Sequence, residues 1–187
     1  MLPNWFVGLK IPAGDWHGER VMDPPEGFRR FTGDDLHLTV AFLGAVGEDA
    51  AYAAWTQRRG WRKGALLVEL GEVVPMGNPG RYSALSLILG KGRGEVTALM
   101  DFHRAGMFAA AGARPDTRPP LPHVTVARPR QRASREERRR GIAWADSQDC
   151  RGVELTIAEI ALYTWSEDRT RSLFRVVASG LVSDPGS

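Results

Sequence analysis

Cysteine, lysine and long apolar runs are scarce in this sequence of 187 residues. Its one cysteine, Cys150, cannot form a disulfide within the chain and offers no thiolate cluster for a metal ion. No apolar run approaches the roughly 18 residues that a membrane-spanning helix needs, and the first residues lack the basic segment of a secretory signal. We therefore expect a cytoplasmic protein without disulfides or membrane spans.

Lysine is replaced almost entirely by arginine. Lys10, Lys63 and Lys91 are the three lysines among 25 basic residues, which leaves 25 − 3 = 22 arginines, and the formal net charge is +3. Arginine binds phosphate through paired hydrogen bonds and stacks on bases, so this bias is compatible with a nucleic-acid ligand. A GC-rich coding sequence would produce the same bias, and composition does not choose between the two explanations.

Histidine is also scarce, and two of the four histidines stand in matching phrases. Segment 36–44 reads LHLTVAFLG and segment 122–128 reads PHVTVAR, so each contains His-apolar-Thr-Val-Ala. β-Branched and apolar neighbours favour a strand for both segments. Residues two apart in a strand share a face, which predicts that His37 lies beside Thr39 and that His123 lies beside Thr125.

Two histidine–threonine pairs suit acid–base chemistry at an anionic group. One imidazole can take a proton from water while the other protonates a leaving oxygen, and threonine hydroxyls can donate hydrogen bonds to phosphate oxygens. A single His-x-Thr on an apolar strand is most often structural. Two copies in matching contexts favour a catalytic pair, and phosphoester hydrolysis without a metal needs this set of groups.

The two phrases resemble the signature of the 2H phosphoesterase superfamily, which is named for two His-x-Thr/Ser motifs. Within it, the chain is most similar to the bacterial 2'-5' RNA ligase / RNA 2',3'-cyclic phosphodiesterase family. The likeness reaches from the first strand to segments 160–166 and 173–177, although only the two motifs are highly specific. It implies a single α+β domain over 1–187, with two pseudo-symmetric lobes. Each lobe would be an antiparallel sheet with outer helices, and the two would face each other across a central cleft.

The resemblance also implies an activity and the residues that perform it. RNA 2',3'-cyclic phosphate ends would be hydrolysed to 2'-phosphates without a metal or cofactor, and a 2'-5' RNA ligase reaction would be possible at the same site. His123 would be the base acting on water and His37 the acid toward the ribose 3'-oxygen, although the near symmetry of the motifs leaves this assignment open. Thr39 and Thr125 would bind the phosphate. We expect a monomer whose partner is an RNA end or a small nucleotide cyclic phosphate, with no membrane partner.

Arginines after the second motif are further candidates for phosphate binding. Arg128 lies five residues after His123, where similar phosphodiesterases carry an arginine near the phosphate. Strand parity turns Arg128 away from His123 unless the strand has ended or bulged. Arg130 and Arg132 are expected to guide an RNA backbone, whereas residues 138–140 are interpreted as a solvated helix face.

Four other side chains, two aromatic and two histidine, each allow a functional and a structural interpretation. Phe42 and Trp165 are possible base-stacking groups, but core positions are the favoured interpretation. His17 lies among polar residues and is expected at the surface. His103 lies on the apolar face of a predicted helix, where a buried histidine is expected rather than a catalytic one.

The rest of the pattern predicts elements around the two motifs. We expect strands over 5–11, 65–74, 81–89, 153–164 and 172–182, a long loop over 13–35, and helices over 48–59 and 95–111. Ser134 and Glu137 form a capping box that starts a further helix, ending near Ala145.

Three other functions are compatible with these residues. The first is a two-histidine phosphodiesterase for a small nucleotide cyclic phosphate or a 2'-5' oligoadenylate. The second is a non-catalytic module that binds RNA ends, which would not require two titrating groups. The third is a metal enzyme with the histidines as ligands, which the lack of carboxylates or cysteines at ligand spacing disfavours.

Overall fold

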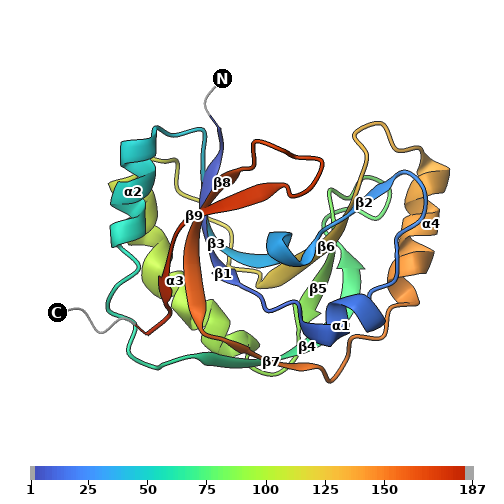
Figure 1. Cartoon of the computed structure of the whole chain (residues 1–187), viewed down its shortest axis with the longest axis horizontal. Coiled ribbons are helices and arrows are strands. Elements are labelled where there is room, and N and C mark those ends of the chain that lie inside the picture. The colour runs from blue at the N-terminus through green and yellow to red at the C-terminus, as the bar shows by residue number, and fades with distance from the viewer. Residues whose placement is uncertain (1–2, 184–187) are drawn as a thin grey trace.

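The computed structural model describes residues 3–183 and has a mixed α+β fold of two lobes (Figure 1). Within this range the elements in chain order are β1 (Trp5–Lys10), α1 (Gly14–Glu19), β2 (Phe28–Arg30), the 3-10 helix η1 (Gly33–Asp35), β3 (His37–Gly44), α2 (Glu48–Thr56), β4 (Leu66–Pro75), β5 (Leu85–Leu89), α3 (Arg93–Ala110), β6 (His123–Pro129), α4 (Arg135–Asp146), β7 (Glu154–Ile157), β8 (Glu159–Trp165) and β9 (Phe174–Leu181). The elements form two sheets with helices on their outer sides.

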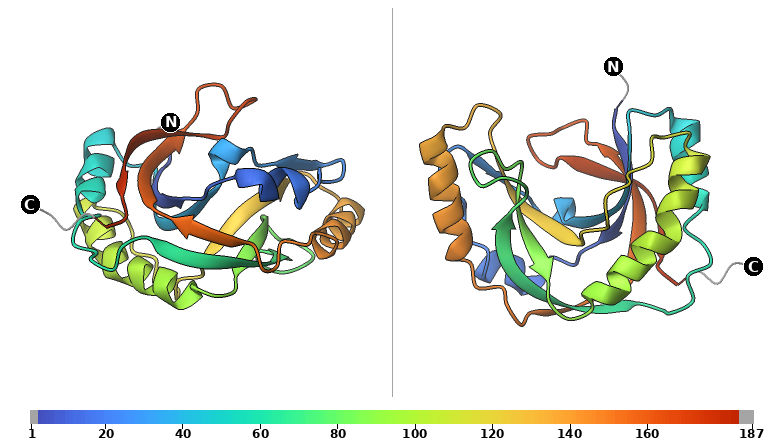
Figure 2. Two further views of the ribbon diagram at one scale, coloured as in Figure 1. Left: turned by 60° about the horizontal axis from the view of Figure 1, so that its bottom comes forward. Right: turned by 180° about the vertical axis from the view of Figure 1, so that it is seen from behind.

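Each sheet is antiparallel and contains one of the two motif strands. The first sheet has the order β3-β1-β8-β9, and the second has the order β2-β6-β5-β4-β7. β3 and β6 contact each other although they belong to different sheets, so the two motifs meet where the lobes join. Figure 2 shows the sheets as the two arms of an open V, with α2 and α3 outside one arm and α4 outside the other. The expectation of two antiparallel lobes with outer helices is confirmed.

Apolar residues explain why these strands form sheets with helices on one side. Val7, Leu9, Leu38 and Val40 are almost fully buried, and they belong to one core that continues through both sheets. In β4 buried residues alternate with more exposed ones, which fits a strand covered on one face, and the apolar spacing of α3 fits a helix that packs on such a face. None of the helices in the described range is long and apolar enough to cross a membrane.

Both motif strands contain a β-bulge at the same position. In β3, Thr39 pairs with Gly8 and Ala41 with Val7, so Val40 is the extra residue. In β6, Thr125 pairs with Ser86 and Ala127 with Leu85, so Val126 is the extra residue. A bulge reverses the facing of every residue that follows it. The fifth residue after each histidine, Phe42 or Arg128, is therefore turned toward the side that the histidine faces.

Two sequence-based expectations about elements were wrong. The segment 13–35 contains α1, β2 and η1 instead of a long loop, and β2 pairs with β6 as an edge strand. The segment 153–164 is not one strand. It breaks at Ala158, so that β7 pairs with β4 in one sheet while β8 pairs with β1 in the other. Apolar and β-branched residues continue through the break, which is why the pattern alone does not reveal it.

Three further expectations concerned the start of α4, His103 and His17. The capping box at α4 is present: Ser134 Oγ accepts from the Glu137 amide, and the Glu137 carboxylate accepts from the Ser134 amide. His103 is buried as expected, and Cys150 is also buried. His17 is buried rather than solvated, and its ring lies edge-on to the ring of Trp16.

Candidate functional site

The second motif histidine lies at the edge of a cavity between the lobes. His123 is the first residue of β6 and is partly exposed. Its Nδ1 lies 2.7 Å from the carbonyl oxygen of Leu121. Because a carbonyl oxygen can only accept, Nδ1 carries the hydrogen and Nε2 is the nitrogen that remains for chemistry. The short loop before β6 therefore holds the imidazole in one tautomer and one orientation.

The first motif histidine repeats this arrangement in a different environment. His37 begins β3, and its Nδ1 donates to the carbonyl oxygen of Asp35 at 2.7 Å, again two residues upstream. The ring of His37 lies against three aromatic rings, with centroids 4.5 Å from Phe6, 5.1 Å from Phe174 and 5.4 Å from Tyr163. These contacts leave only 9% of His37 exposed.

Burial decides the charge of His37. It lowers the pKa of His37 to about 4, and the positive charge of Arg128 and the proximity of His123 act in the same direction. The hydrogen bond to the Asp35 carbonyl opposes this shift but does not overcome it. His37 is therefore neutral at pH 7 in the free protein, with Nε2 as a proton acceptor.

The two threonines also differ in their surroundings. Thr39 is half-buried on the cavity wall. Thr125 is buried, and its hydroxyl lies 3.2 Å from the hydroxyl of Ser86 on the neighbouring strand β5. If Ser86 donates, the Thr125 hydroxyl keeps its own hydrogen for another acceptor. Ser86 was not predicted as a site residue, because it belongs to a predicted strand with no motif of its own.

The bulges bring two unlike side chains to equivalent places in the cavity. This cavity of about 700 Å³ is lined by Thr39, Phe42, His123 and Arg128, among other residues. Phe42 is 55% exposed, so the interpretation of Phe42 as a core residue was wrong. Arg128 faces the same cavity as His123, because the bulge at Val126 reverses the strand parity. One equivalent position thus offers an apolar ring and the other a guanidinium group.

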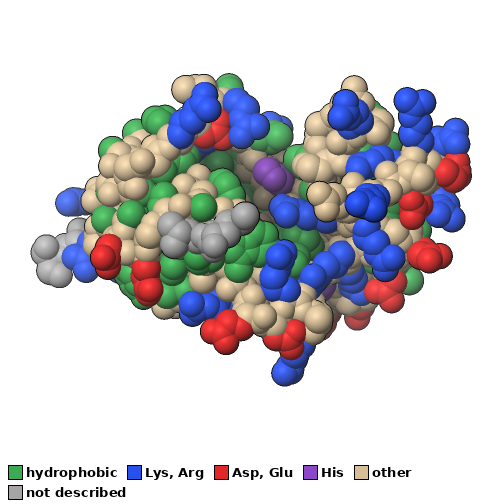
Figure 3. Space-filling model, turned by 90° about the horizontal axis from the view of Figure 1, so that it is seen from above, with side chains coloured by type: hydrophobic (Ala, Val, Ile, Leu, Met, Phe, Trp, Pro, Cys, Tyr) green, Lys and Arg blue, Asp and Glu red, His purple; other side chains and the backbone are tan. Residues whose placement is uncertain are grey.

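Positive charge gathers along the rim of this hollow, where a histidine is visible between the lobes (Figure 3). Partial burial and the nearby Arg169 lower the pKa of Arg128, which shows that the two guanidinium groups lie close together. Arg169 itself stacks on the ring of Trp165, 3.8 Å from its centroid. Two neighbouring cations favour an anionic ligand at this end of the cavity.

Asp35 is a buried carboxylate that fixes the approach to His37. Its Oδ1 accepts hydrogen bonds from the amides of Leu173 and Phe174 and from the hydroxyl of Ser172. Its side chain therefore ties the β8–β9 connection to η1, while its backbone carbonyl orients the imidazole of His37. Asp35 was expected only as the last residue of the long loop over 13–35. Its position two residues before the motif histidine was the available clue.

An ion-pair cluster lines the same cavity as His123. Asp116 pairs with Arg118 at 2.8 Å and with Arg104 of α3 at 3.2 Å, and all three residues line the cavity. The hydrogen bonds from Arg118 hold the pKa of Asp116 at about 2, so this carboxylate is ionised. The cluster ties the segment before β6 to α3.

Three other residues that were singled out from the sequence do not line the cavity. Arg130 lies beyond the end of β6, where its amide donates to the Gly27 carbonyl, and it does not line the cavity. Trp165 is half-buried, with Phe174 on one side and Arg169 over its ring. Arg138 is half-buried rather than on a solvated helix face. Among residues 3–183, no group of three or more His, Cys, Asp or Glu side chains is arranged to hold a metal ion.

Comparison with known proteins shows the fold. No protein-family model and no curated protein matches this sequence. A solved structure described as a phosphoesterase is 22% identical over 98% of this chain and 100% of its own, with a TM-score of 0.69. Escherichia coli LigT complexed with NADP+ is 22% identical over 98% and 100%, with a TM-score of 0.67. A Thermus thermophilus protein, TT0787, is 19% identical over 96% and 97%, with a TM-score of 0.69. LigT has also been solved with 3'-AMP, with ATP and with phosphate. The chain therefore has the fold that these proteins share.

Proposed function

We propose that this protein is a 2H phosphoesterase that hydrolyses RNA 2',3'-cyclic phosphate ends to 2'-phosphates by two-histidine acid–base catalysis. One observation carries the proposal. Each motif histidine donates through Nδ1 to the carbonyl oxygen two residues upstream, so that both keep Nε2 for a proton transfer. Structural histidines have no reason to share this arrangement. His123 lines one cavity with Thr39 and Arg128, and His37, which does not line it, lies close enough to Arg128 and His123 for both to lower its pKa. The phosphoesterase and LigT structures with the same fold support a phosphoester substrate.

The environments of the two histidines reverse the roles that were suggested from the sequence. A general base must enter the reaction neutral, and the buried His37 is neutral because its pKa is about 4. His37 is therefore proposed as the base and His123, which lies at the open edge of the cavity, as the acid. The earlier assignment followed only the resemblance, which carried no information about burial.

The reaction then balances in one displacement. His37 Nε2 takes a proton from water as the water oxygen bonds to phosphorus, and the bond from phosphorus to the ribose 3'-oxygen breaks. His123 supplies a proton to that oxygen, which leaves a 3'-hydroxyl and a 2'-phosphate. The hydroxyls of Thr39 and Thr125 and the guanidinium of Arg128 stabilise the additional negative charge on the phosphate oxygens. A 5'-hydroxyl in place of water would produce a 2'-5' linkage.

A small nucleotide cyclic phosphate is the second candidate substrate. The solved LigT structures with NADP+, 3'-AMP and ATP show that a protein of this fold binds single nucleotides and dinucleotides. A cavity of about 700 Å³ has room for one nucleotide and its phosphate. The exposed ring of Phe42 offers a surface on which a base of either substrate can stack.

The proposal is tested by incubating the protein in EDTA with a short RNA that ends in a 2',3'-cyclic phosphate. We expect conversion to a 2'-phosphate, with kcat about 10²- to 10⁴-fold lower in His37→Gln and in His123→Gln. His103→Gln is the matched control, because His103 is buried outside the cavity, and it should retain activity.

Two outcomes would contradict the proposal. Binding of the RNA without turnover by the wild-type protein would favour a module that binds RNA ends. Activity that disappears in EDTA and returns with added metal would favour a metal enzyme.

A further inference from the structure

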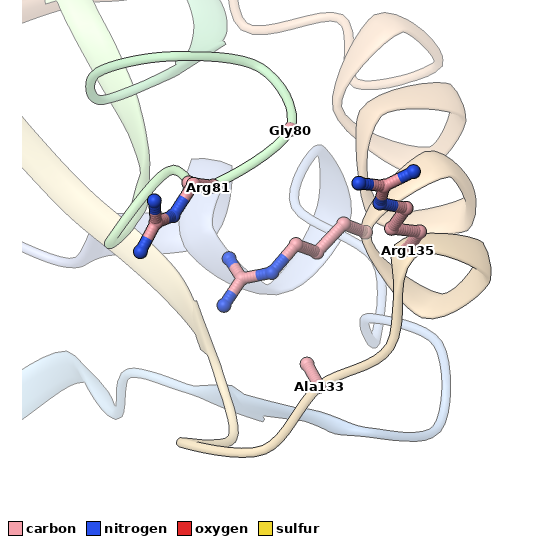
Figure 4. A pocket seen from close by; sticks show the side chains of 5 residues that line it. Gly80, Arg81, Ala133 and Arg135 are labelled. Atoms are coloured by element: carbon pink, nitrogen blue, oxygen red, sulfur yellow. The ribbon is translucent and has the colours of Figure 1, made fainter.

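A second hollow, separate from the cavity between the lobes, is lined mainly by arginine. It measures about 510 Å³ and is formed by Gly80, Arg81, Ala133, Arg135 and Arg138, which we call the arginine pocket. Figure 4 shows Arg81 on the turn between β4 and β5, with Arg135 across from it at the start of α4. Carboxylates are absent from the lining formed by the described residues. Three guanidinium groups around one hollow favour an anion with several oxygens.

The pocket is held rigidly by contacts between Tyr82 and α4. The Tyr82 hydroxyl donates to the Arg138 carbonyl at 2.8 Å, and the Arg138 guanidinium donates in return to the Tyr82 carbonyl. Tyr82 is only 1% exposed, and α4 lies directly on it through Gly141. A Cβ atom at Gly141 would come within 2.4 Å of the Tyr82 hydroxyl. The wall of the pocket is thus fixed before any ligand binds, which reduces the entropy lost on binding.

The other two arginines of the pocket remain available to a ligand. Within residues 3–183, neither Arg81 nor Arg135 forms a salt bridge, whereas Arg139 of the same helix pairs with Glu136. The remaining carboxylate in the first turn of α4, Glu137, accepts the Ser134 amide in the capping box. The local acidic groups are therefore engaged elsewhere, and the positive charge of the pocket is not neutralised by them.

One turn separates the arginine pocket from the catalytic cavity. Met76, Gly77 and Ser83 line the cavity, while Gly80 and Arg81 of the same β4–β5 turn line the pocket. A strand whose 3'-end occupies the cavity can therefore cross this turn and reach the pocket. We propose that the arginine pocket binds the phosphate backbone of an RNA strand upstream of its cyclic end. This inference rests on the proposed function and identifies the substrate as an oligonucleotide.

Comparing a long and a short substrate tests the proposal. The wild-type protein and Arg81→Ala/Arg135→Ala would be assayed on a ten-nucleotide RNA with a 2',3'-cyclic phosphate and on a 2',3'-cyclic mononucleotide. We expect the double variant to raise KM for the RNA about tenfold, and to reduce the slope of log affinity against log salt by about 1.4, which corresponds to two lost phosphate contacts. Its kcat and KM for the mononucleotide should not change.

Arg139→Ala/Arg140→Ala is the matched control. It also removes two positive charges, but from residues of α4 that do not line the pocket. It should leave KM for the RNA within about twofold of the wild-type value. An unchanged KM for the RNA in the pocket variant would overturn the proposal, as would an equal rise for both substrates or an equal effect of the control.

A binding assay separates failure of the pocket from failure of the proposed function. Anisotropy of a labelled ten-nucleotide RNA with a 2'-phosphate end requires no turnover. We expect about tenfold weaker binding by the pocket variant, even if the wild-type protein hydrolyses neither substrate. Unchanged binding would overturn the proposal. Displacement of the RNA by inorganic phosphate at the same concentration as the RNA would also overturn it, because the pocket would then be a site for free anions.

Discussion

The two motif strands have nearly the same sequence and the same backbone but different surroundings. Each begins with a histidine whose Nδ1 donates to the carbonyl oxygen two residues upstream, and each has a bulge at the valine after the threonine. His37 is nevertheless packed in an aromatic cluster, whereas His123 lies at the open edge of the cavity. The repeated phrase thus specifies the backbone, and the neighbouring strands specify how deeply each histidine is buried.

The difference extends to the residues after the bulges. Phe42 and Arg128 occupy equivalent positions, five residues after their histidines, and both line the cavity. A ring can stack on a base, while a guanidinium group can bind a phosphate. Two similar halves therefore supply the two kinds of contact that one nucleotide needs. If the two halves are specialised in this way, equivalent changes in them should have different effects.

The largest difference is expected between Arg128→Ala and Phe42→Ala. Arg128→Ala should reduce kcat about 10²- to 10³-fold, because it removes charge stabilisation from the transition state. Phe42→Ala should raise KM about tenfold with little effect on kcat, because base stacking stabilises the ground state and the transition state equally. Steady-state kinetics on a 2',3'-cyclic mononucleotide measure both effects. Similar changes in both variants would mean that the two positions are not specialised.

The pH dependence of kcat/KM tests the proposed roles of the histidines. With His37 as a base of pKa about 4, the rate should remain on its plateau as the pH falls toward 4. A base with the ordinary histidine pKa would lose about 30-fold by pH 5. A rate that instead rises as the pH falls toward 4 would identify His37 as the acid and restore the assignment first made from the sequence.

Burial of neutral His37 should also make the folded protein less stable in acid. Between pH 6.5 and about 4 the unfolded chain binds a proton at this residue and the folded protein does not, so stability falls as the pH falls through this window. The change attributable to His37 is up to about 3 kcal/mol.

Urea unfolding of the wild-type protein and His37→Gln at pH 7 and pH 4.5 measures this change. The loss of stability in acid should be smaller in the variant. His17 and His103, whose pKa values burial also lowers, contribute equally to both proteins. Equal losses would show that His37 titrates normally in the folded state.

The smallest effect is expected at the partner of Thr125. Ser86→Ala removes one buried hydrogen bond and should cost about 1 kcal/mol of folding free energy. It should also lower kcat only a few-fold, since the Thr125 hydroxyl remains in place. The first half has no equivalent side chain, because Thr39 pairs with Gly8. Chemical denaturation and steady-state kinetics measure the two changes, and a loss of activity as large as that of Arg128→Ala would give Ser86 a role of its own.

The two motifs carried the resemblance from which the two-lobed fold was predicted, and they made Thr39 and His123, which line one cavity, candidate site residues. The repeated phrase indicates two similar strands, whereas strand parity alone turned Arg128 away from His123, and the bulge that turns it toward the cavity was not predicted. The break at Ala158, the burial of His17 and the exposure of Phe42 were not predicted. Each of these depends on which distant strand or helix packs alongside, and apolar periodicity does not indicate the packing partner.

The contacts that tune the site were missed for the same reason. Asp35 and Ser86 act through partners far away in the sequence, at Leu173 and Thr125. The arginine pocket likewise combines Arg81 with the start of α4, more than 50 positions away. No motif connects these residues, so only the assembled structure brings them together.

The measurement that tests the central claim most directly is an NMR titration of the histidine imidazoles with a nucleoside 2'-phosphate, the product of the proposed reaction. If both motifs face one phosphate, the signals of His37 and His123 shift together with one dissociation constant, while those of His17 and His103 do not move. A shift of only one motif histidine, or two different dissociation constants, would contradict the account.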